Sequence, residues 1–181
     1  MSDLKLDTPL GIDEVDFRIQ SINKGGYATI LAYKDARADI RRLNAVYGIL
    51  GWQREHSRDN HNCTVSLWDK DHNHWVSKED TGKESFTEKE KGLASDSFKR
   101  ACFNWGIGLE LYDYPAIKIK LNQNEWELYN GKPKQTWDLK LKEWTWFSVF
   151  DDKVVTYLAA KDWNNNLRFE HGLRPKKEGT K

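Results

Sequence analysis

The chain has 181 residues, of which 38% are apolar and 31% are charged, a composition typical of a globular protein with a polar surface. Its apolar residues form no run of the roughly 18–20 that a membrane-spanning helix needs, and the first ten residues, MSDLKLDTPL, lack the layout of a secretion signal. The two cysteines, Cys63 and Cys102, lie in apolar patterns. We therefore expect buried thiols in a reducing, intracellular compartment rather than a disulfide scaffold.

The net charge is only +1, but acidic and basic residues are segregated along the chain. Residues 1–17 hold five acids against one lysine, whereas residues 18–58 hold eight lysines and arginines against three acids. A basic stretch of this kind can steer a polyanion locally. Ordinary solvated faces would give the same pattern, so charge alone leaves both interpretations open.

The first predicted elements are a strand and a helix. The segment Val15–Ile22 has apolar residues at alternate positions, and a basic glycine turn follows it. YATILAY (27–33) is rich in β-branched and aromatic residues, which predicts a strand. Apolar residues then recur every three or four positions over residues 36–47, which predicts a helix with Asp35 as its N-cap and Gly48 as its C-cap.

Three short strands are predicted next. They are WQREHS (52–57), CTVSLWD (63–69) and HWVSKED (74–80), and the turn KDHN joins the last two. A second helix follows these strands. This order of elements predicts an α+β fold in which an antiparallel β-sheet packs on a long helix, a β-β-β-α core.

The second predicted helix covers residues 88–108. Thr87 and Glu90 form a capping box before it, and two glycines end it. At 100° per residue, its apolar residues occupy one half of the helical wheel. Lys99, Arg100 and Phe103 fall on the other side, where a phenylalanine beside two cations is unusual. A subunit contact, nucleic acid stacked on the ring, or simple exposure would each explain this arrangement.

Beyond residue 115 the pattern becomes rich in strands. AIKIKL alternates apolar residues with lysine, WELYNGKPKQTW holds an Asn-Gly turn, and LKLKEWTWFSVF and VVTYLAA read as paired strands around Asp151 and Asp152. We expect residues 1–115 to form the core, residues 116–170 a β-rich extension of the same domain, and residues 171–181 a basic disordered tail. The nine Trp, seven Tyr and seven Phe are core fillers first, but aromatic rings also stack on unpaired bases.

Two stretches carry a resemblance to a known family. YKDAR…LN…G…GW and GLASDSFKRA…WGIG occur in order within residues 15–115. In this respect the chain resembles the single-strand annealing proteins of the Rad-fifty-two type, and especially their phage Sak-type and bacterial DdrA-like members. The resemblance implies a homo-oligomeric ring or arc that binds single-stranded DNA through its backbone. It also implies annealing of complementary strands in homologous recombination or DNA repair, without a cofactor.

The resemblance also implies which residues contact DNA. Lys99 and Arg100 fall on the family's Lys-Arg pair, which contacts the phosphates of the inner strand. Arg18 matches an arginine that lines the same groove, and Arg37 matches a basic residue that supports or contacts it. Lys91 aligns with a lysine of the same helix in the eukaryotic members.

Two further residues are weaker candidates. Lys83 lies in the loop before the second helix, where eukaryotic members place part of a second DNA site, but the loop here is shorter. Phe103 stands beside the cations of the helix and would meet either a base or a neighbouring subunit. A recombinase, an exonuclease or a strand-coating protein are the partner proteins that the family suggests, and a bacterial cytoplasm or nucleoid is the expected location.

Alternative functions remain open at this point. The chain lacks a G-x-x-x-x-G-K-[ST] phosphate loop, in agreement with annealing that needs no ATP. One alternative is a structural oligomerisation module whose basic faces bind acidic protein partners. Another is a metal-dependent nuclease with Glu79, Asp80 and Glu84 as ligands and Lys83 nearby. A metal site is a third, built from a cluster of possible ligands: His56, His61, Cys63, His72 and His74.

Overall fold

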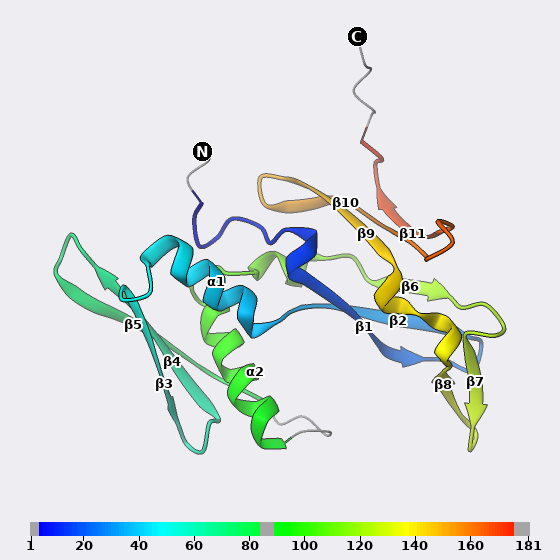
Figure 1. The fold of residues 1–181 in the computed structure, drawn as a ribbon, viewed down its shortest axis with the longest axis horizontal. Helices are drawn as coiled ribbons and strands as arrows, with labels where there is room; N and C mark the ends of the chain where they lie inside the picture. The colour runs from blue at the N-terminus through cyan, green and yellow to red at the C-terminus, as the bar shows by residue number, and fades with distance from the viewer. Residues whose placement is uncertain (1–3, 84–88, 176–181) are drawn as a thin grey trace, which may run out of the picture. The chain divides into compact units, whose positions relative to one another are not determined.

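The computed structural model describes residues 4–83 and 89–175, without the side chains of residues 89–91. The chain divides into two compact units (Figure 1). The first unit consists of Met1–Glu14 and Lys34–Leu109, and the second unit consists of Val15–Tyr33 and Glu110–Lys181. The predicted boundary at residue 115 differs from this division. The hairpin formed by residues 15–33 belongs with the C-terminal segment, because its second strand pairs with a strand beyond residue 115.

The sheet of the first unit is antiparallel and has three strands. β3 (Trp52–Ser57), β4 (Asn62–Asp69) and β5 (His74–Thr81) follow one another in that order. Each agrees with its prediction to within one residue at either end. β4 is the most buried strand, because it lies between two neighbours and α2 (Lys89–Phe103) packs on it.

Helix α1 (Ala36–Tyr47) has the predicted bounds and caps. The Asp35 side chain accepts a hydrogen bond from the backbone N–H of Arg37, which satisfies a donor that the first helical turn leaves unpaired. At the other end, Gly48 has a φ of 73° and donates its N–H to the Asn44 carbonyl. α1 also contacts α2, so the two helices and the sheet share one core.

Helix α2 is shorter than predicted. It has 15 residues and ends at Phe103 instead of residue 108, so the expected long helix is not observed. Gly106 and Gly108 both have positive φ, at 89° and 75°, and the N–H of Gly106 donates to the Phe103 carbonyl. These glycines turn the chain away from the helix axis earlier than the sequence pattern indicates. The predicted capping box includes Thr87, which lies outside the described residues.

Most of the predicted apolar half of α2 is buried, whereas Ala94, and Trp105 beyond the end of the helix, are half-buried. Leu93, Phe98, Ala101 and Cys102 are all shielded from solvent. They face the buried side chains of β4, among them Val65. The wheel analysis of this side of the helix is therefore confirmed.

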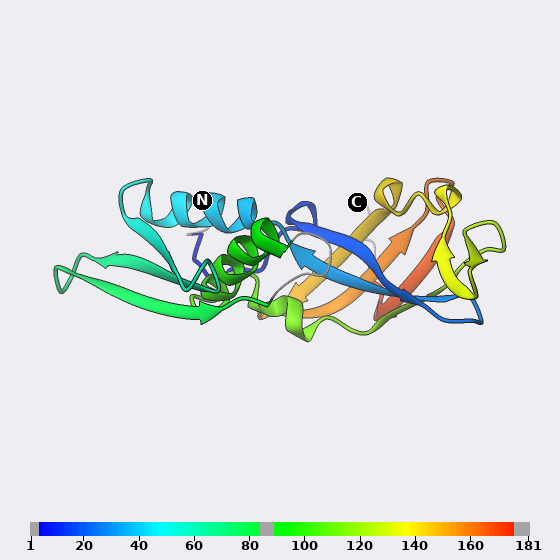
Figure 2. The ribbon, with the colours of Figure 1, turned by 90° about the horizontal axis from the view of Figure 1, so that it is seen from below.

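The second unit consists of strands in three small sheets. β1 (Val15–Ile22), β2 (Tyr27–Lys34) and β6 (Ile117–Lys120) form one of them, in that order, with β6 antiparallel to β2. Figure 2 shows the second sheet, where β10 lies between β9 and β11. Its strands are antiparallel, and their bounds are Thr145–Asp151 for β9, Val154–Lys161 for β10 and Leu167–Gly172 for β11. β7 (Trp126–Tyr129) and β8 (Lys132–Gln135) form the third, a hairpin.

Both predicted tight turns of the second unit are present. Asn130 and Gly131 have φ values of 49° and 73°, and Asp152 and Lys153 have φ values of 40° and 70°. Two consecutive residues with positive φ are the backbone signature of the two-residue hairpin turn that suits twisted strands. The Asn-Gly turn and the turn at Asp152 therefore connect antiparallel strands, as predicted.

The segment before β9 differs from its prediction. LKLKEWTWFSVF was expected to be one strand, but Trp137–Leu139 and Leu141–Glu143 form two short 3₁₀ turns, and β9 starts only at Thr145. Lys140 separates the turns with a φ of 44°. Residues 171 and 172 belong to β11 rather than to a tail, and residues 176–181 lie outside the described part.

A buried arginine ties the second unit together. Arg168 in β11 donates two hydrogen bonds to the Glu125 carboxylate, at 2.8 Å and 2.7 Å, and one to Asp162 at 3.3 Å. Its guanidinium also lies 4.6 Å from the ring centroid of Trp144.

The fold is α+β with antiparallel sheets, as predicted.

Candidate functional site

Two cations of the predicted basic stretch lie in the interior of the first unit. Lys34 is 1% exposed, its Nζ lies 2.5 Å from Asp39 Oδ1, and it also donates to the Ile107 carbonyl. Arg42 is also buried and donates to Glu14 Oε2 at 3.2 Å. These side chains hold the unit together, so they do not belong to a ligand-binding surface.

The buried pair sets the electrostatics between α1 and α2. Burial raises the pKa of Asp39 to about 6, although the Lys34 ammonium opposes this shift. Burial also raises the pKa of the Cys102 thiol, and the Asp39 carboxylate raises it further. The thiol therefore stays protonated and acts as an apolar core group.

One edge of α2 carries two of the predicted phosphate ligands, Lys99 and Arg100, and neither side chain is fully exposed. Arg100 is half-buried, and its Nε lies 3.2 Å from Asp96 Oδ2 one turn earlier. The same carboxylate oxygen accepts the backbone N–H of Lys83 at 2.9 Å. Asp96 thus holds both the Arg100 side chain and the backbone at Lys83, while the Lys83 side chain is exposed.

Lys99 lies near the start of α1. The pKa of Asp35 is lowered to about 2, mainly by hydrogen bonds from Arg37 and in part by the charge of Lys99. Lys99 also acts to lower the pKa of Asp39. Among the described residues Lys99 forms no ion pair within 4 Å, in contrast to Arg100.

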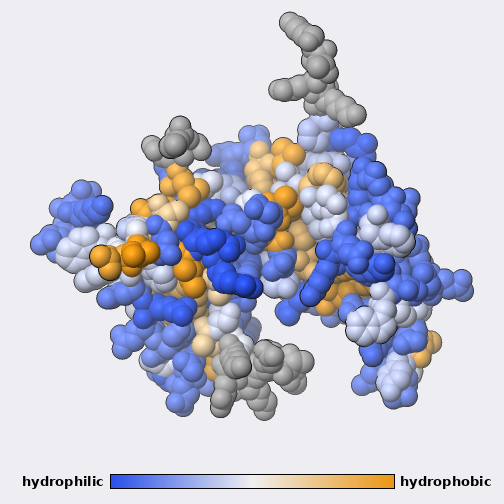
Figure 3. Space-filling model, viewed as in Figure 1, coloured by the Kyte–Doolittle hydropathy of each residue, from blue (hydrophilic) through white to orange (hydrophobic). Residues whose placement is uncertain are grey.

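Arg37 is exposed at the start of α1. Its Nε and Nη2 donate to the Asp35 carboxylate at 3.0 Å and 3.1 Å. Figure 3 shows strongly hydrophilic side chains over α1 on the viewed face. The structure thus brings Arg37 and Lys99 to the same end of α1, where both positive charges lower the pKa of Asp35.

Phe103 occupies a different position from the one that the wheel predicts. It is half-buried rather than exposed, and its ring centroid lies 3.9 Å from the buried Lys34 ammonium. The ring therefore covers the buried ion pair, which the pattern of α2 alone does not reveal. Lys91 lies in the first turns of α2, but its side chain is outside the described part.

Arg18 belongs to the second unit. It is exposed in β1, and its guanidinium carbon lies 5.2 Å from the ring centroid of Tyr33. Alternation along the strand places Arg18 on the opposite face from Phe17 and Ile19. The arginine is available to a ligand, whereas the ring of Tyr33 beside it is half-buried.

Three further pairs of a lysine and an exposed aromatic ring occur in the second unit. The ring centroids lie 4.7 Å, 5.2 Å and 4.7 Å from the ammonium groups in the pairs Tyr27–Lys120, Tyr129–Lys134 and Trp163–Lys140. These aromatic residues are 50–59% exposed. Exposed rings with adjacent cations can offer both a stacking surface and a phosphate ligand.

Sequence reasoning missed these pairs. Tyr27 lies directly opposite Lys120 in the register of β2 and β6, so the pair depends on strands that are far apart in the chain. The alternating lysines of AIKIKL were the available signal. Their partners could be identified only from the pairing of the two strands.

The predicted histidine cluster does not form a metal site in the described part of the chain. Among the residues that the structure describes, no group of three or more His, Cys, Asp and Glu side chains is arranged to hold a metal ion. His72 pairs with Asp69 at 2.8 Å, and His61 contacts the Arg58 carbonyl. His72 and His74 lie next to each other, with ring centroids 5.9 Å apart, and His56 lies opposite Cys63 in the register of β3 and β4, but neither pair gains a third ligand among the described residues.

The proposed acidic ligands of a nuclease also have local partners. Glu79 accepts hydrogen bonds from Asn62 at 2.8 Å and Thr64 at 3.0 Å on the neighbouring strand. Asp80 accepts from Asn104 at 3.4 Å. Glu84, the third predicted ligand, lies outside the described residues.

Comparisons with known proteins add no assignment. No family model, no curated protein and no solved structure matches the chain. In the described part of the chain, none of the helices has the length and apolar character needed to span a membrane.

Proposed function

We propose that the protein binds single-stranded DNA without sequence preference and anneals complementary strands in homologous recombination or DNA repair, without ATP. The observation that carries the proposal is the set of three exposed aromatic rings in the second unit, each with a lysine over it. Proteins that bind single strands combine cations, which hold the phosphates, with rings on which bases stack. Binding of this kind is independent of base identity.

The first unit would add phosphate contacts along α2. Lys99 and Arg100 are the pair that the family resemblance assigns to this role, with Arg37 beside them. A phosphate would have to compete with Asp96 for Arg100, because their ion pair is 3.2 Å long. Lys99 forms no comparable pair among the described residues. We therefore expect Lys99 to contribute more to DNA affinity than Arg100.

The remaining parts of the proposal come from the resemblance. We propose a homo-oligomeric ring or arc in which single-stranded DNA follows the cations of successive subunits. The proposed location is a bacterial cytoplasm or nucleoid. The proposed protein partner is a recombinase, an exonuclease or a strand-coating protein.

The test is the affinity for a labelled oligo-dT across a salt series, measured by fluorescence anisotropy. For single strands, the slope of log K against log salt is about −0.7 for each phosphate contact. Lys99→Ala should weaken binding and make the slope smaller by about 0.7. Arg100→Ala should have a smaller effect on affinity. Lys70→Ala removes an exposed charge in the turn between β4 and β5 and is the matched control.

Two results would contradict the proposal. One is the absence of binding at low salt, and the other is an affinity that does not respond to salt. Either would favour the oligomerisation module that binds acidic protein partners. The oligomeric mass of each variant should equal that of the wild type, which separates a lost contact from a lost assembly.

A further inference from the structure

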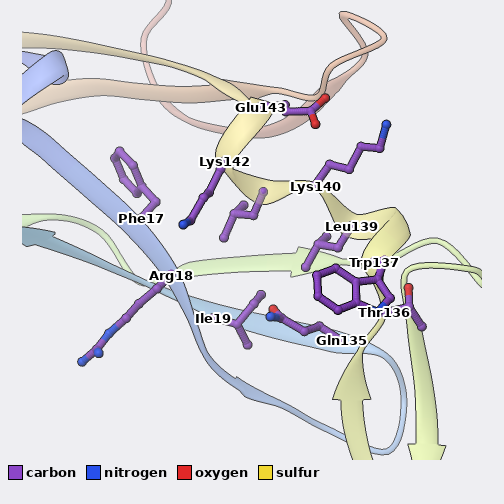
Figure 4. A pocket seen from close by; sticks show the side chains of 11 residues that line it. Phe17, Arg18, Ile19, Gln135, Thr136, Trp137, Leu139, Lys140, Lys142 and Glu143 are labelled. Carbon is purple, nitrogen blue, oxygen red and sulfur yellow. The ribbon is translucent and has the colours of Figure 1, made fainter. Parts of the chain in front are cut away.

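The surface of the second unit contains a pocket of about 450 Å³ (Figure 4). It lies between β1 and the two 3₁₀ turns that precede β9. The side chains that line it combine apolar, aromatic and cationic groups, among them Phe17, Ile19, Gln135, Trp137, Leu139 and Lys142. Its volume falls in the range of about 300–1,000 Å³ that small-molecule sites have.

The apolar part of the pocket is held in place by packing. Phe17 stacks on Trp146 with ring centroids 3.6 Å apart and planes 2° from parallel. Leu139 is buried, and its carbonyl accepts a hydrogen bond from the Trp144 indole at 3.1 Å. Neither side chain has to move to make room for a ligand, so the pocket is preformed.

Trp137 forms the rim of the pocket and is 97% exposed. Its neighbours are fixed, because the Thr136 hydroxyl donates to the Asn124 carbonyl at 2.5 Å and Leu139 is buried. The indole is therefore presented to solvent from an anchored turn. A tryptophan in this position forgoes nearly all of the free energy that burial would supply, which is expected where a ligand covers the ring.

One cation of the lining extends toward β1, across the pocket. Figure 4 shows Lys142 pointing in this direction, whereas Lys140, Glu143 and Arg18 point away. The Lys140 ammonium instead lies over Trp163. Among the described residues Lys142 has no ion pair within 4 Å, so its charge is available to an anionic group of a ligand.

We infer that the pocket takes one unstacked nucleobase of a bound single strand, with the base against Trp137 and a neighbouring phosphate on Lys142. This inference rests on the proposed function and names a specific site for it. A flat ring beside an anion matches an exposed indole beside an unpaired ammonium. The apolar floor accepts any base, which agrees with binding that is independent of sequence. One anchored base would still leave its neighbours open for pairing.

The experiment compares two labelled oligonucleotides of equal length, oligo-dT and a strand of abasic sites with the same number of phosphates. Trp137→Ala in the full chain should weaken oligo-dT binding about 10-fold, because stacking on one ring typically contributes that much. It should leave the affinity for the abasic strand unchanged. Lys142→Ala should weaken both. Trp137→Phe should retain most of the oligo-dT affinity, and Tyr112→Ala is the control for loss of an exposed ring in the same unit.

The outcomes separate this inference from the proposed function. If the wild type binds neither strand, both fail. If it binds the strands but Trp137→Ala changes both affinities equally, or neither, the pocket holds no base and only the inference fails. If Trp137→Ala instead lowers the oligomeric mass, the indole contacts another copy of the chain, and the inference is overturned.

Discussion

The buried pair of Lys34 and Asp39 provides a test of how the first unit is held together. Lys34→Met removes the ammonium and keeps a side chain of similar length. It leaves a carboxylate that is 0% exposed and has no cation within ion-pair distance among the described residues. The Oδ2 atom of Asp39 already lacks a hydrogen-bond partner, and the Lys99 charge and the Cys102 thiol lower the pKa of this carboxyl less than the Lys34 ammonium does.

The expected cost at pH 8 is about 3–5 kcal/mol, the range for removing one partner of a buried ion pair. The double variant Lys34→Met with Asp39→Leu should recover most of this loss, because an apolar pair of similar volume avoids the cost of burying charge. The double variant should therefore be within about 1 kcal/mol of the wild type at pH 8, since volume-conserving changes in a core are tolerated.

The cost should depend on pH. The pKa of Asp39 is about 6 in the folded protein, compared with an ordinary value of 3.8. The folded state thus binds this proton more tightly than the unfolded chain does. Stability from this group is fully present below pH 3.8 and is lost as the pH rises through 6, by about 3 kcal/mol. Without Lys34 the pKa rises further, so at pH 5 the carboxyl is neutral and Lys34→Met should cost much less than at pH 8.

Urea unfolding at pH 5 and pH 8 measures these differences. Both α-helices of the described chain, α1 and α2, belong to the first unit, so circular dichroism at the helix band reports its unfolding. Arg37→Ala removes an exposed pair and is the control, with an expected cost below about 1 kcal/mol. Equal losses for the single variant at both pH values, or an equal loss for the single and double variants, would refute this reasoning.

Two further predictions concern the backbone. Asp35→Ala should lower the free energy of unfolding by about 1 kcal/mol in the same urea assay. The pKa of Asp35 is lowered to about 2 in the folded protein, so the stability that this carboxylate contributes is present above pH 3.8 and is lost as the pH falls through 2. A destabilisation by Asp35→Ala that is as large at pH 2.5 as at neutral pH would contradict this prediction. Gly108→Ala should destabilise more than Gly131→Ala in urea unfolding followed by tryptophan fluorescence. Both glycines have positive φ, but a Cβ at Gly108 would lie 2.9 Å from Lys34 Cδ, whereas nothing lies within 4 Å at Gly131. Equal effects would show that the close contact is unimportant.

Local patterns in the sequence predicted the elements of the first unit well. The Asp35 cap, the Gly48 cap and the KDHN turn each depend on residues that are close together in the chain. The predicted end of an element was wrong where a glycine turns the chain before the apolar pattern stops, as at Gly106, three residues beyond the end of α2. Residues 139–143 were predicted as the start of a strand, because their leucines and lysines alternate, but they lie in two 3₁₀ turns.

Contacts between distant segments were not predictable in this way. The pairing of β2 with β6 moves residues 15–33 out of the N-terminal core, and no local pattern records it. Lys34 is one of the eight cations of the basic stretch 18–58 that could steer a polyanion. It is nevertheless buried, and its ammonium donates to Asp39 and to the Ile107 carbonyl. The same lysine explains why Phe103 is half-buried, because its ammonium lies against the phenylalanine ring. A helical wheel cannot predict this contact, since it shows one helix and not the segments packed against it.

Strand annealing itself is measured as the rate at which two complementary oligonucleotides pair in the presence of the protein, without nucleotide or metal ion. Fluorescence quenching between end labels follows pairing in real time. We expect the wild type to accelerate pairing well beyond the spontaneous rate, and the variant with both Lys99→Ala and Arg100→Ala to lose most of this acceleration while keeping its oligomeric mass. A wild-type rate equal to the spontaneous one, at low salt and with saturating protein, would contradict the account.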